Sequence, residues 1–179
     1  RLGLLKEMDD AQGVIDLLDD PDPDVRQAAV LALGAVGDPE AGLSIMDVLE
    51  ERGCDWLPCE PVITALSAMA HGLVPDLTDL LTMDDVPPQL TAMAAAVAGR
   101  AQLISLAPVL RDLLATKPPQ EPRQRALTAL GLIGTPADAP LLMEFTSPAE
   151  PLEVRLAAIE SLGHLGMAAA VRGVDALVA

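Results

Sequence analysis

Cysteine and histidine are the side chains in this sequence best suited to metal binding or nucleophilic chemistry. Cys54 and Cys59 lie five residues apart in the segment CDWLPC. Two thiols are too few for a disulfide scaffold and incomplete for a zinc site. They could pair in an oxidising compartment, whereas free thiols are expected in the cytosol. His71 and His164 lie far apart in the sequence, and we expect two isolated surface residues, because a metal site needs convergent ligands.

Three aspartates imitate the start of a calcium-binding loop. Asp20, Asp22 and Asp24 alternate as calcium ligands do, but the twelfth position, which should be a glutamate, is Leu31. Helix capping and turn formation explain the three acids better. The sequence also lacks a glycine-rich phosphate loop, a G-x-S-x-G elbow and a paired zinc motif. We therefore expect no catalytic residue, no metal site, no cofactor and no enzyme activity.

The composition of the 179 residues predicts an all-α protein. Hydrophobic residues make up 51% of the chain, but Trp56 and Phe145 are the only aromatic ones. The interior must be filled by Ala, Leu, Val, Ile and Met, which suits helices packed closely on helices. The sequence shows neither a long apolar run nor a signal peptide, so we expect a cytoplasmic location and no membrane contact.

Negative charge is concentrated in the first half of the chain. The net charge is −16; residues 1–85 hold 4 Lys or Arg against 19 Asp or Glu, and residues 86–179 hold 7 against 8. An acidic surface repels a phosphate backbone and few aromatic side chains are present to stack on bases, so nucleic-acid binding is excluded. The acids either solvate the surface or attract a basic segment of a partner protein.

A fifteen-residue pattern recurs three times, as DVRQAAVLALGAVGD (24–38), EPRQRALTALGLIGT (121–135) and EVRLAAIESLGHLGM (153–167). The aligned arginines are Arg26, Arg123 and Arg155, and the aligned glycines are Gly34, Gly131 and Gly163. Weaker copies at 60–73 and 87–100 are aligned by placing Ala65 and Ala92 under Ala29. The resulting period, about 32 residues, is that of a two-helix solenoid repeat.

Each repeat divides into two helices, because apolar residues recur at three- and four-residue steps on both sides of a turn. The predicted repeats are residues 10–37, 38–72, 73–100, 101–135 and 136–167, with partial helices at 2–5 and 168–179. Pro61, Pro88 and Pro122 suit the first turn of second helices. Gly37, Gly134 and Gly166 are expected to end those helices in the left-handed conformation.

The pattern resembles the short bacterial HEAT repeat, V-R-x-x-A-x-x-A-L-G-x-x-G, the form that also occurs in bilin lyases. The resemblance implies one domain over residues 1–179, a right-handed α-solenoid of about five repeats. Because the partial helices at the two ends lack their mates, we also expect the chain to be a segment of a longer protein. The resemblance further implies that Arg26, Arg123 and Arg155 form a structural ladder with acidic residues near the turn between the helices. In the first repeat the expected acid is Asp19, Asp20 or Asp22.

The outer face of the second helices, which by this resemblance lines the concave side of the solenoid, is the predicted partner-binding surface, because positions that should meet solvent are largely apolar. Alternatively, tighter curvature hides these positions, or the alignment of the middle repeats is wrong. The residues assigned to the surface are Gln27, Leu31, Ile63, His71, Leu90, Gln124, Leu132, Leu156 and Glu160.

These features predict a scaffold that binds a helix or extended peptide of another protein without catalysing a reaction. The alternative is a subunit similar to phycobilin lyases, which would bind a tetrapyrrole. A third class, helical DNA glycosylases, predicts a basic, aromatic concavity that the composition opposes.

Overall fold

The computed structural model describes residues 8–178, and side chains from residue 12 to residue 166. This part of the chain consists of helices and the turns between them, without a strand, as the composition predicts. It forms two compact units, residues 1–76 and 77–179. The partial helix expected at residues 2–5 lies outside the described residues.

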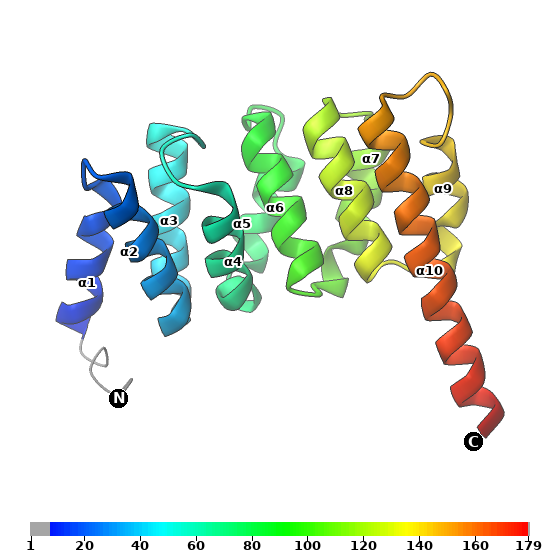
Figure 1. The fold of residues 1–179 in the computed structure, drawn as a ribbon, viewed down its shortest axis with the longest axis horizontal. Helices are drawn as coiled ribbons and strands as arrows, with labels where there is room; N and C mark the ends of the chain where they lie inside the picture. Colours follow the sequence, from blue (N-terminus) through cyan, green and yellow to red (C-terminus); the bar gives the residue numbers. More distant parts are fainter. Residues whose placement is uncertain (1–7, 179) are drawn as a thin grey trace. The chain divides into compact units, whose positions relative to one another are not determined.

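The first unit is built from two layers of helices (Figure 1). Its second helices, which carry the repeated pattern, pack side by side, and its first helices cover one flank. The elements are α1 (Met8–Asp16), η1 (Leu17–Asp19), α2 (Pro23–Val36), α3 (Pro39–Arg52), α4 (Cys59–Met69) and η2 (Ala70–Gly72). Helix α5 (Val74–Thr82) crosses the boundary between the units.

The second unit repeats this arrangement, with the second helices α6, α8 and α10 in one layer and the first helices α7 and α9 in the other (Figure 1). Its elements are α6 (Pro88–Arg100), η3 (Ile104–Leu106), α7 (Ala107–Ala115), α8 (Gln120–Ile133), η4 (Pro136–Asp138), α9 (Ala139–Glu144) and α10 (Leu152–Val178).

Aspartate, proline and glycine set the helix ends in the first unit. The Asp22 carboxylate accepts the Asp24 backbone N–H at 2.9 Å, and Pro23 occupies the first turn of α2. Asp38 caps α3 in the same way. Gly37, with φ of 77°, ends α2 in the left-handed conformation that a residue without Cβ adopts at little cost. The aspartate cap at the start of α2 and the left-handed Gly37 at its end are both as the sequence predicts.

Two other predicted glycine caps are wrong. Gly134 ends α8 in an extended conformation, with φ of −76° and ψ of −170°. Its backbone N–H still closes the last turn on the Leu130 carbonyl, so a left-handed residue is not needed. Gly166 lies inside α10, which runs without interruption from Leu152 to Val178. The separate helix expected at 168–179 is therefore the continuation of α10.

Neighbouring second helices touch through glycine. A Cβ on Gly34 of α2 would lie 2.7 Å from Cα of Ala65 on α4, and one on Gly131 of α8 would lie 2.7 Å from Cα of Ser161 on α10. The Ser161 hydroxyl lies within hydrogen-bond distance of the Leu127 carbonyl across the interface, at 2.8 Å, and of the Ala157 carbonyl of its own helix, at 2.7 Å. This close approach explains why the interior needs small residues instead of aromatic ones.

These contacts correct the alignment of the middle repeats. Ser161 lies six positions after the arginine of its repeat, and Ala65 faces Gly34 just as Ser161 faces Gly131. Cys59, six positions before Ala65, therefore aligns with Arg26. Because Gly99 faces Ala129 in the same manner, Thr91 aligns with Arg26 in the third repeat. The alignments that placed Ala65 and Ala92 under Ala29 are thus wrong by three and two residues.

A buried carboxylate joins two repeats of the second unit. Asp138 of η4 is buried and accepts hydrogen bonds from Arg111 of α7 at 2.5 and 3.2 Å and from the Thr135 backbone N–H at 2.7 Å. Burial raises the pKa of Asp138, but these hydrogen bonds outweigh burial and leave the pKa below its ordinary value. The pKa of Arg111 is raised, chiefly by the same hydrogen bond.

Replacing Gly131 with alanine should destabilise the protein by about 1–3 kcal/mol, because the new methyl group meets backbone and a hydrogen-bonded serine. Gly163→Ala is the matched control. Gly163 occupies the aligned position on α10, where a Cβ would have no described neighbour within 4 Å, so alanine should stabilise that helix by up to about 1 kcal/mol. Urea unfolding of both variants measures the difference, and equal effects would contradict the close contact.

Asp138→Asn should lower the free energy of unfolding at neutral pH by about 1–3 kcal/mol, because Arg111 and Thr135 lose a charged acceptor. A carboxyl whose folded pKa is depressed stabilises the protein above its unfolded pKa, about 3.9. That stability is lost as the pH falls through the lower folded pKa. Acid unfolding of the variant should therefore be less steep, whereas Glu144→Gln, an exposed change on α9, should leave the pH profile unaltered.

Candidate partner-binding surface

The outer face of the second helices exposes single leucines among polar side chains. On α2, Leu31 is 45% exposed and Gln27 is exposed beside it. On α8 and α10, Leu132 and Leu156 are 42% and 48% exposed. Glu160 is exposed on α10, and Gln124 is half-buried on α8. These six residues belong to the repeats with the strong pattern. They lie on the outer face of the second helices, as the sequence predicts.

Two predicted anchors are wrong. Ile63 of α4 is 1% exposed and Leu90 of α6 is 2% exposed, so both belong to the core. The corrected alignment gives the reason: Ile63 aligns with Val30 and Leu90 with Val25, not with outer positions of α2. The outer positions of α4 are instead Glu60, Thr64 and Ala68, all exposed.

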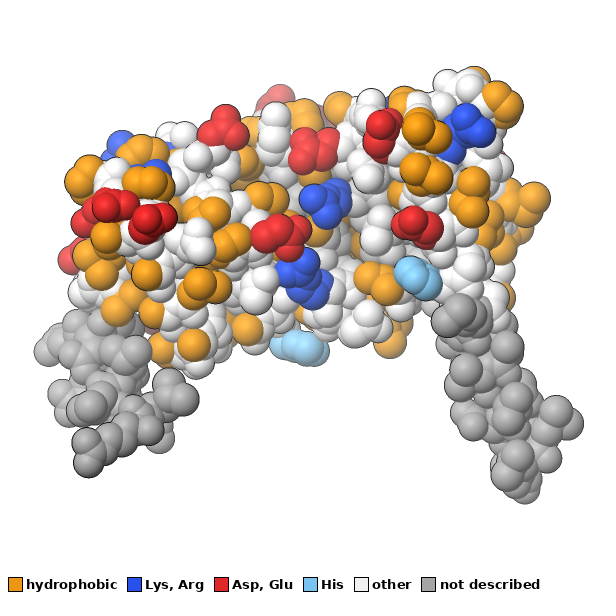
Figure 2. Space-filling view, viewed as in Figure 1, with side chains coloured by type: hydrophobic (Ala, Val, Ile, Leu, Met, Phe, Trp, Pro, Cys, Tyr) orange, Lys and Arg blue, Asp and Glu red, His pale blue; other side chains and the backbone are white. Residues whose placement is uncertain are grey.

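The apolar strip expected along the second helices is therefore interrupted. Within each unit, Figure 2 shows apolar side chains scattered among charged and other groups on this face. In the second unit, Ala96 is half-buried and Arg100 is exposed on α6 at the positions aligned with Leu31 and Ala35. The outer face of the second helices is therefore mixed, with isolated apolar side chains among polar and charged ones.

The histidines differ in their placement. His164 is exposed on α10 at the position aligned with Ala35, as predicted. His71 is exposed but lies in η2, beyond the end of α4, because the corrected alignment moves it by three residues. In the described part of the chain, His, Cys, Asp and Glu side chains do not gather in a group that could hold a metal ion. Asp20 and Asp22 accept backbone N–H groups of the turn before α2.

Arg26 links its own repeat to the following one. Its Nη1 donates to the backbone carbonyls of Asp20 and Pro21 at 2.8 and 3.1 Å, and its Nε donates to the Trp56 carbonyl at 3.0 Å. The contacts of Arg26 with its own turn are therefore made to carbonyl oxygens, and the expected pairing with the side chain of Asp19, Asp20 or Asp22 is wrong. Asp19 forms its ion pair with Arg52, at 3.1 Å.

Arg123 occupies the equivalent place in the second unit. Its guanidinium donates to the Pro118 carbonyl of its own turn, at 3.0 and 2.8 Å, and forms an ion pair with Glu150 in the turn of the next repeat. The aligned arginine on α10, Arg155, is half-buried, and its Nε is a buried donor without a hydrogen-bond partner among the described residues. The three arginines thus share a position but not a set of acceptors.

Trp56 is a structural residue that the sequence analysis missed. Its Nε1 donates to the Leu18 carbonyl at 3.0 Å. The guanidinium carbons of Arg26 and Arg52 lie 4.0 and 5.3 Å from its ring centroid, within the range of cation–π contacts. The only tryptophan of an aromatic-poor sequence was the signal that could have identified it. It fastens the turn between α3 and α4 to the first repeat.

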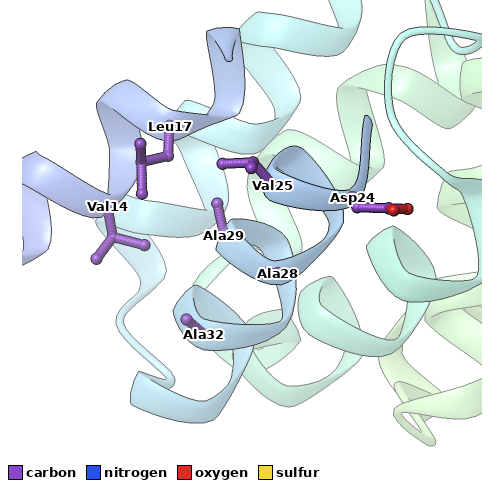
Figure 3. A pocket seen from close by; sticks show the side chains of 7 residues that line it. All are labelled: Val14, Leu17, Asp24, Val25, Ala28, Ala29 and Ala32. Atoms are coloured by element: carbon purple, nitrogen blue, oxygen red, sulfur yellow. The ribbon is translucent and has the colours of Figure 1, made fainter. Parts of the chain in front are cut away.

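The described surface has a groove in each unit. The larger, about 430 Å³, lies on α2 and is lined almost entirely by apolar side chains (Figure 3). The smaller, about 310 Å³, lies between the end of α5 and α7 in the second unit, and Asp84 and Asp112 are among its lining residues. Among the described helices, none combines the length and apolar character that a membrane crossing requires.

Comparisons with known proteins agree with this geometry. The family model for HEAT repeats matches residues 2–53, 74–163 and 107–179, well over half of the chain. A search of curated protein sequences finds no match. Among solved structures, the chain is similar to the complex of CpcE and CpcF of phycocyanin lyase from Nostoc sp. PCC7120, with a TM-score of 0.60 and 24% sequence identity.

That similarity covers 87% of this chain and 64% of the matched chain, and at this identity it concerns the fold alone. The family match confirms the resemblance to HEAT repeats that the repeated arginine, alanine and glycine positions indicate. The chain belongs to the HEAT-repeat family.

Proposed function

We propose that this HEAT-repeat chain is a non-catalytic scaffold that binds a segment of another protein on the outer face of α8 and α10. The observation that supports the proposal is the pair of exposed leucines, Leu132 and Leu156, on two helices held in direct contact at Gly131 and Ser161. Because these helices are fixed to each other, the two apolar points keep a constant separation.

The separation suggests the form of the partner. Leu156 aligns with Gln124, which is eight residues before Leu132, so the leucines differ by about 12 Å along the helix direction. Neighbouring helices are about 8–10 Å apart, which gives a diagonal of roughly 15 Å. An extended peptide spans this distance in four or five residues. The partner should therefore offer two apolar side chains at that spacing.

Charge adds a second element of selection. Glu160 is exposed on α10 between the levels of the two leucines, and Thr128 is exposed on α8. A basic or donor side chain between the two apolar residues of the partner would meet this carboxylate. The excess of acids in residues 1–85 favours the approach of a basic segment by long-range attraction. A cytoplasmic location, where Cys54 and Cys59 stay reduced, is part of the same proposal.

The scattered arrangement of titratable side chains supports a non-catalytic role. Catalysis needs an acid, base or nucleophile held with partners in a pocket. Both described grooves are open to solvent and contain neither histidine nor cysteine. The buried ion pair of the second unit between Arg111 and Asp138 ties repeats together and leaves the carboxylate fully hydrogen-bonded.

Selection from a library of random peptides tests the proposed surface. The chain should enrich peptides with two apolar residues four or five positions apart and a basic residue between them. The variant Leu132→Glu with Leu156→Glu should lose at least about tenfold in affinity for these peptides, because each buried leucine contact is worth about 1.5–3 kcal/mol. Its thermal melt should fall only slightly, since the two side chains are 42% and 48% exposed in the unbound chain.

Met143→Glu is the matched control, because Met143 is 61% exposed on α9, in the other layer of the same unit. It should bind the selected peptides like the unchanged chain. Equal losses in the control, or full binding by the double variant, would place the partner elsewhere.

A lyase-like subunit that binds a tetrapyrrole is the second candidate, and the fold shared with the phycocyanin lyase complex is the observation that favours it. Adding a bilin to the same protein sample distinguishes the two candidates. The scaffold proposal expects an unchanged bilin absorbance spectrum, whereas a shifted spectrum that is lost in the Leu132→Glu, Leu156→Glu variant would favour the second candidate.

A further inference from the structure

The groove between the end of α5 and α7 lies between two complete repeats of the second unit and combines apolar and acidic side chains. Its apolar lining residues are Leu81, Met83, Val109 and Leu113, and its polar ones are Thr82, Asp84, Asp112 and Thr116. Its volume of about 310 Å³ is at the lower end of the range for small-ligand pockets, roughly 300–1,000 Å³. The groove therefore suits one long side chain of a partner better than a large ligand.

The polar lining of this groove offers hydrogen-bond acceptors. The Thr82 hydroxyl donates to the Thr78 carbonyl at 2.9 Å, and the Thr116 hydroxyl donates to the Leu113 carbonyl at 2.7 Å. Each hydroxyl has thus used its hydrogen and keeps only lone pairs for a ligand. The carboxylates of Asp84 and Asp112 are exposed and accept as well. A ligand of the groove must therefore bring donors.

The two carboxylates of the groove are not engaged by the fold. Asp22 and Asp38 cap helices, and Asp138 binds Arg111, the residue before Asp112. Within the described part of the chain, by contrast, the side chains of Asp84 and Asp112 form neither a hydrogen bond nor an ion pair. Both can accept hydrogen bonds from a partner without giving up a contact that stabilises the protein.

Two helix ends add to the negative potential of the groove. Helix α5 ends at Thr82 and α7 ends at Ala115, so the lining residues Thr82 and Thr116 lie at the two C-termini. A helix C-terminus carries a partial negative charge of about half an elementary charge. Lys117, which follows Thr116, opposes this potential only in part, because two carboxylates and two helix ends act in the other direction.

We propose that this groove binds an arginine side chain of a partner protein. The methylene stem of the arginine lies on the apolar lining at Met83, Val109 and Leu113, and its guanidinium binds Asp84 and Asp112. A guanidinium has five N–H donors and is less strongly hydrated than the ammonium group of lysine, so it suits a small apolar groove with several acceptors. Met83, which is 63% exposed in the unbound chain, is covered by the bound stem.

This site is separate from the proposed peptide surface. It lies between α5 and α7, whereas the exposed leucines of the peptide surface belong to α8 and α10. Each of the two sites can be removed while the other is kept, so the two proposals can fail independently.

Selection of random peptides on the full chain carrying Leu132→Glu and Leu156→Glu tests the groove, because this chain lacks the other proposed surface. The enriched peptides should share an arginine. Adding Asp84→Asn and Asp112→Asn should lower the affinity for a selected peptide at least about tenfold in fluorescence anisotropy, because the guanidinium loses both of its charged acceptors. The helical circular dichroism should be retained, since both aspartates are exposed.

Asp79→Asn with Asp85→Asn is the matched control. Both residues are exposed, on α5 and in the turn that follows it, and neither lines the groove. This pair changes the net charge by the same amount as the groove pair. It should lower the affinity less than about threefold, because exposed charges outside the groove act only through screened long-range attraction.

Replacing the arginine of the selected peptide with citrulline, a neutral residue of nearly the same shape, completes the test. It should lower the affinity at least about tenfold when the groove is intact and should have little effect when Asp84→Asn and Asp112→Asn are present, since the two changes remove the same interaction. The proposal is overturned if the selected peptides share no arginine, if the groove pair and the control pair lose affinity equally, or if the citrulline peptide binds as tightly as the arginine peptide.

Discussion

The close approach of neighbouring second helices is the constraint on which the rest of the structure depends. At Gly34, Gly99 and Gly131 a Cβ would lie 2.7–2.8 Å from the backbone of the next second helix. Helices at this spacing leave room only for alanine, serine and short aliphatic side chains between them. The constraint explains the nearly aromatic-free composition, and it fixes which side of every second helix is buried and which side faces out.

The arginine of the repeat adds a polar link between modules. A guanidinium can serve several acceptors at once, so Arg26 and Arg123 bridge their own turn and the next turn with one side chain. The acceptors differ, a carbonyl in one case and a carboxylate in the other. Where the arginine is absent, the aligned residues are Cys59 and Thr91, and Arg111 with Asp138 provides a different link in the second unit.

The sequence predicts the fold class and the three repeats with the full pattern, because their arginines and glycines can be aligned in only one way. It misplaces Ile63 and Leu90, because an alanine-rich helix can be aligned at several registers with equal apolar match and only the glycine contacts distinguish them. It also misses Trp56 and Asp138. Their roles depend on chain segments that meet only in the folded state, at Leu18 and Arg111.

Amide hydrogen exchange in the first unit tests most directly whether the arginine couples adjacent repeats. In Arg26→Ala, exchange should become about tenfold faster or more at the Trp56 amide, which belongs to the following repeat, as well as at Asp20 in its own turn. Arg52→Ala removes the other arginine beside Trp56, a solvent-exposed ion-pair partner, and should change exchange little. Faster exchange confined to the Asp20 turn, or equal effects of the two variants, would contradict the coupling.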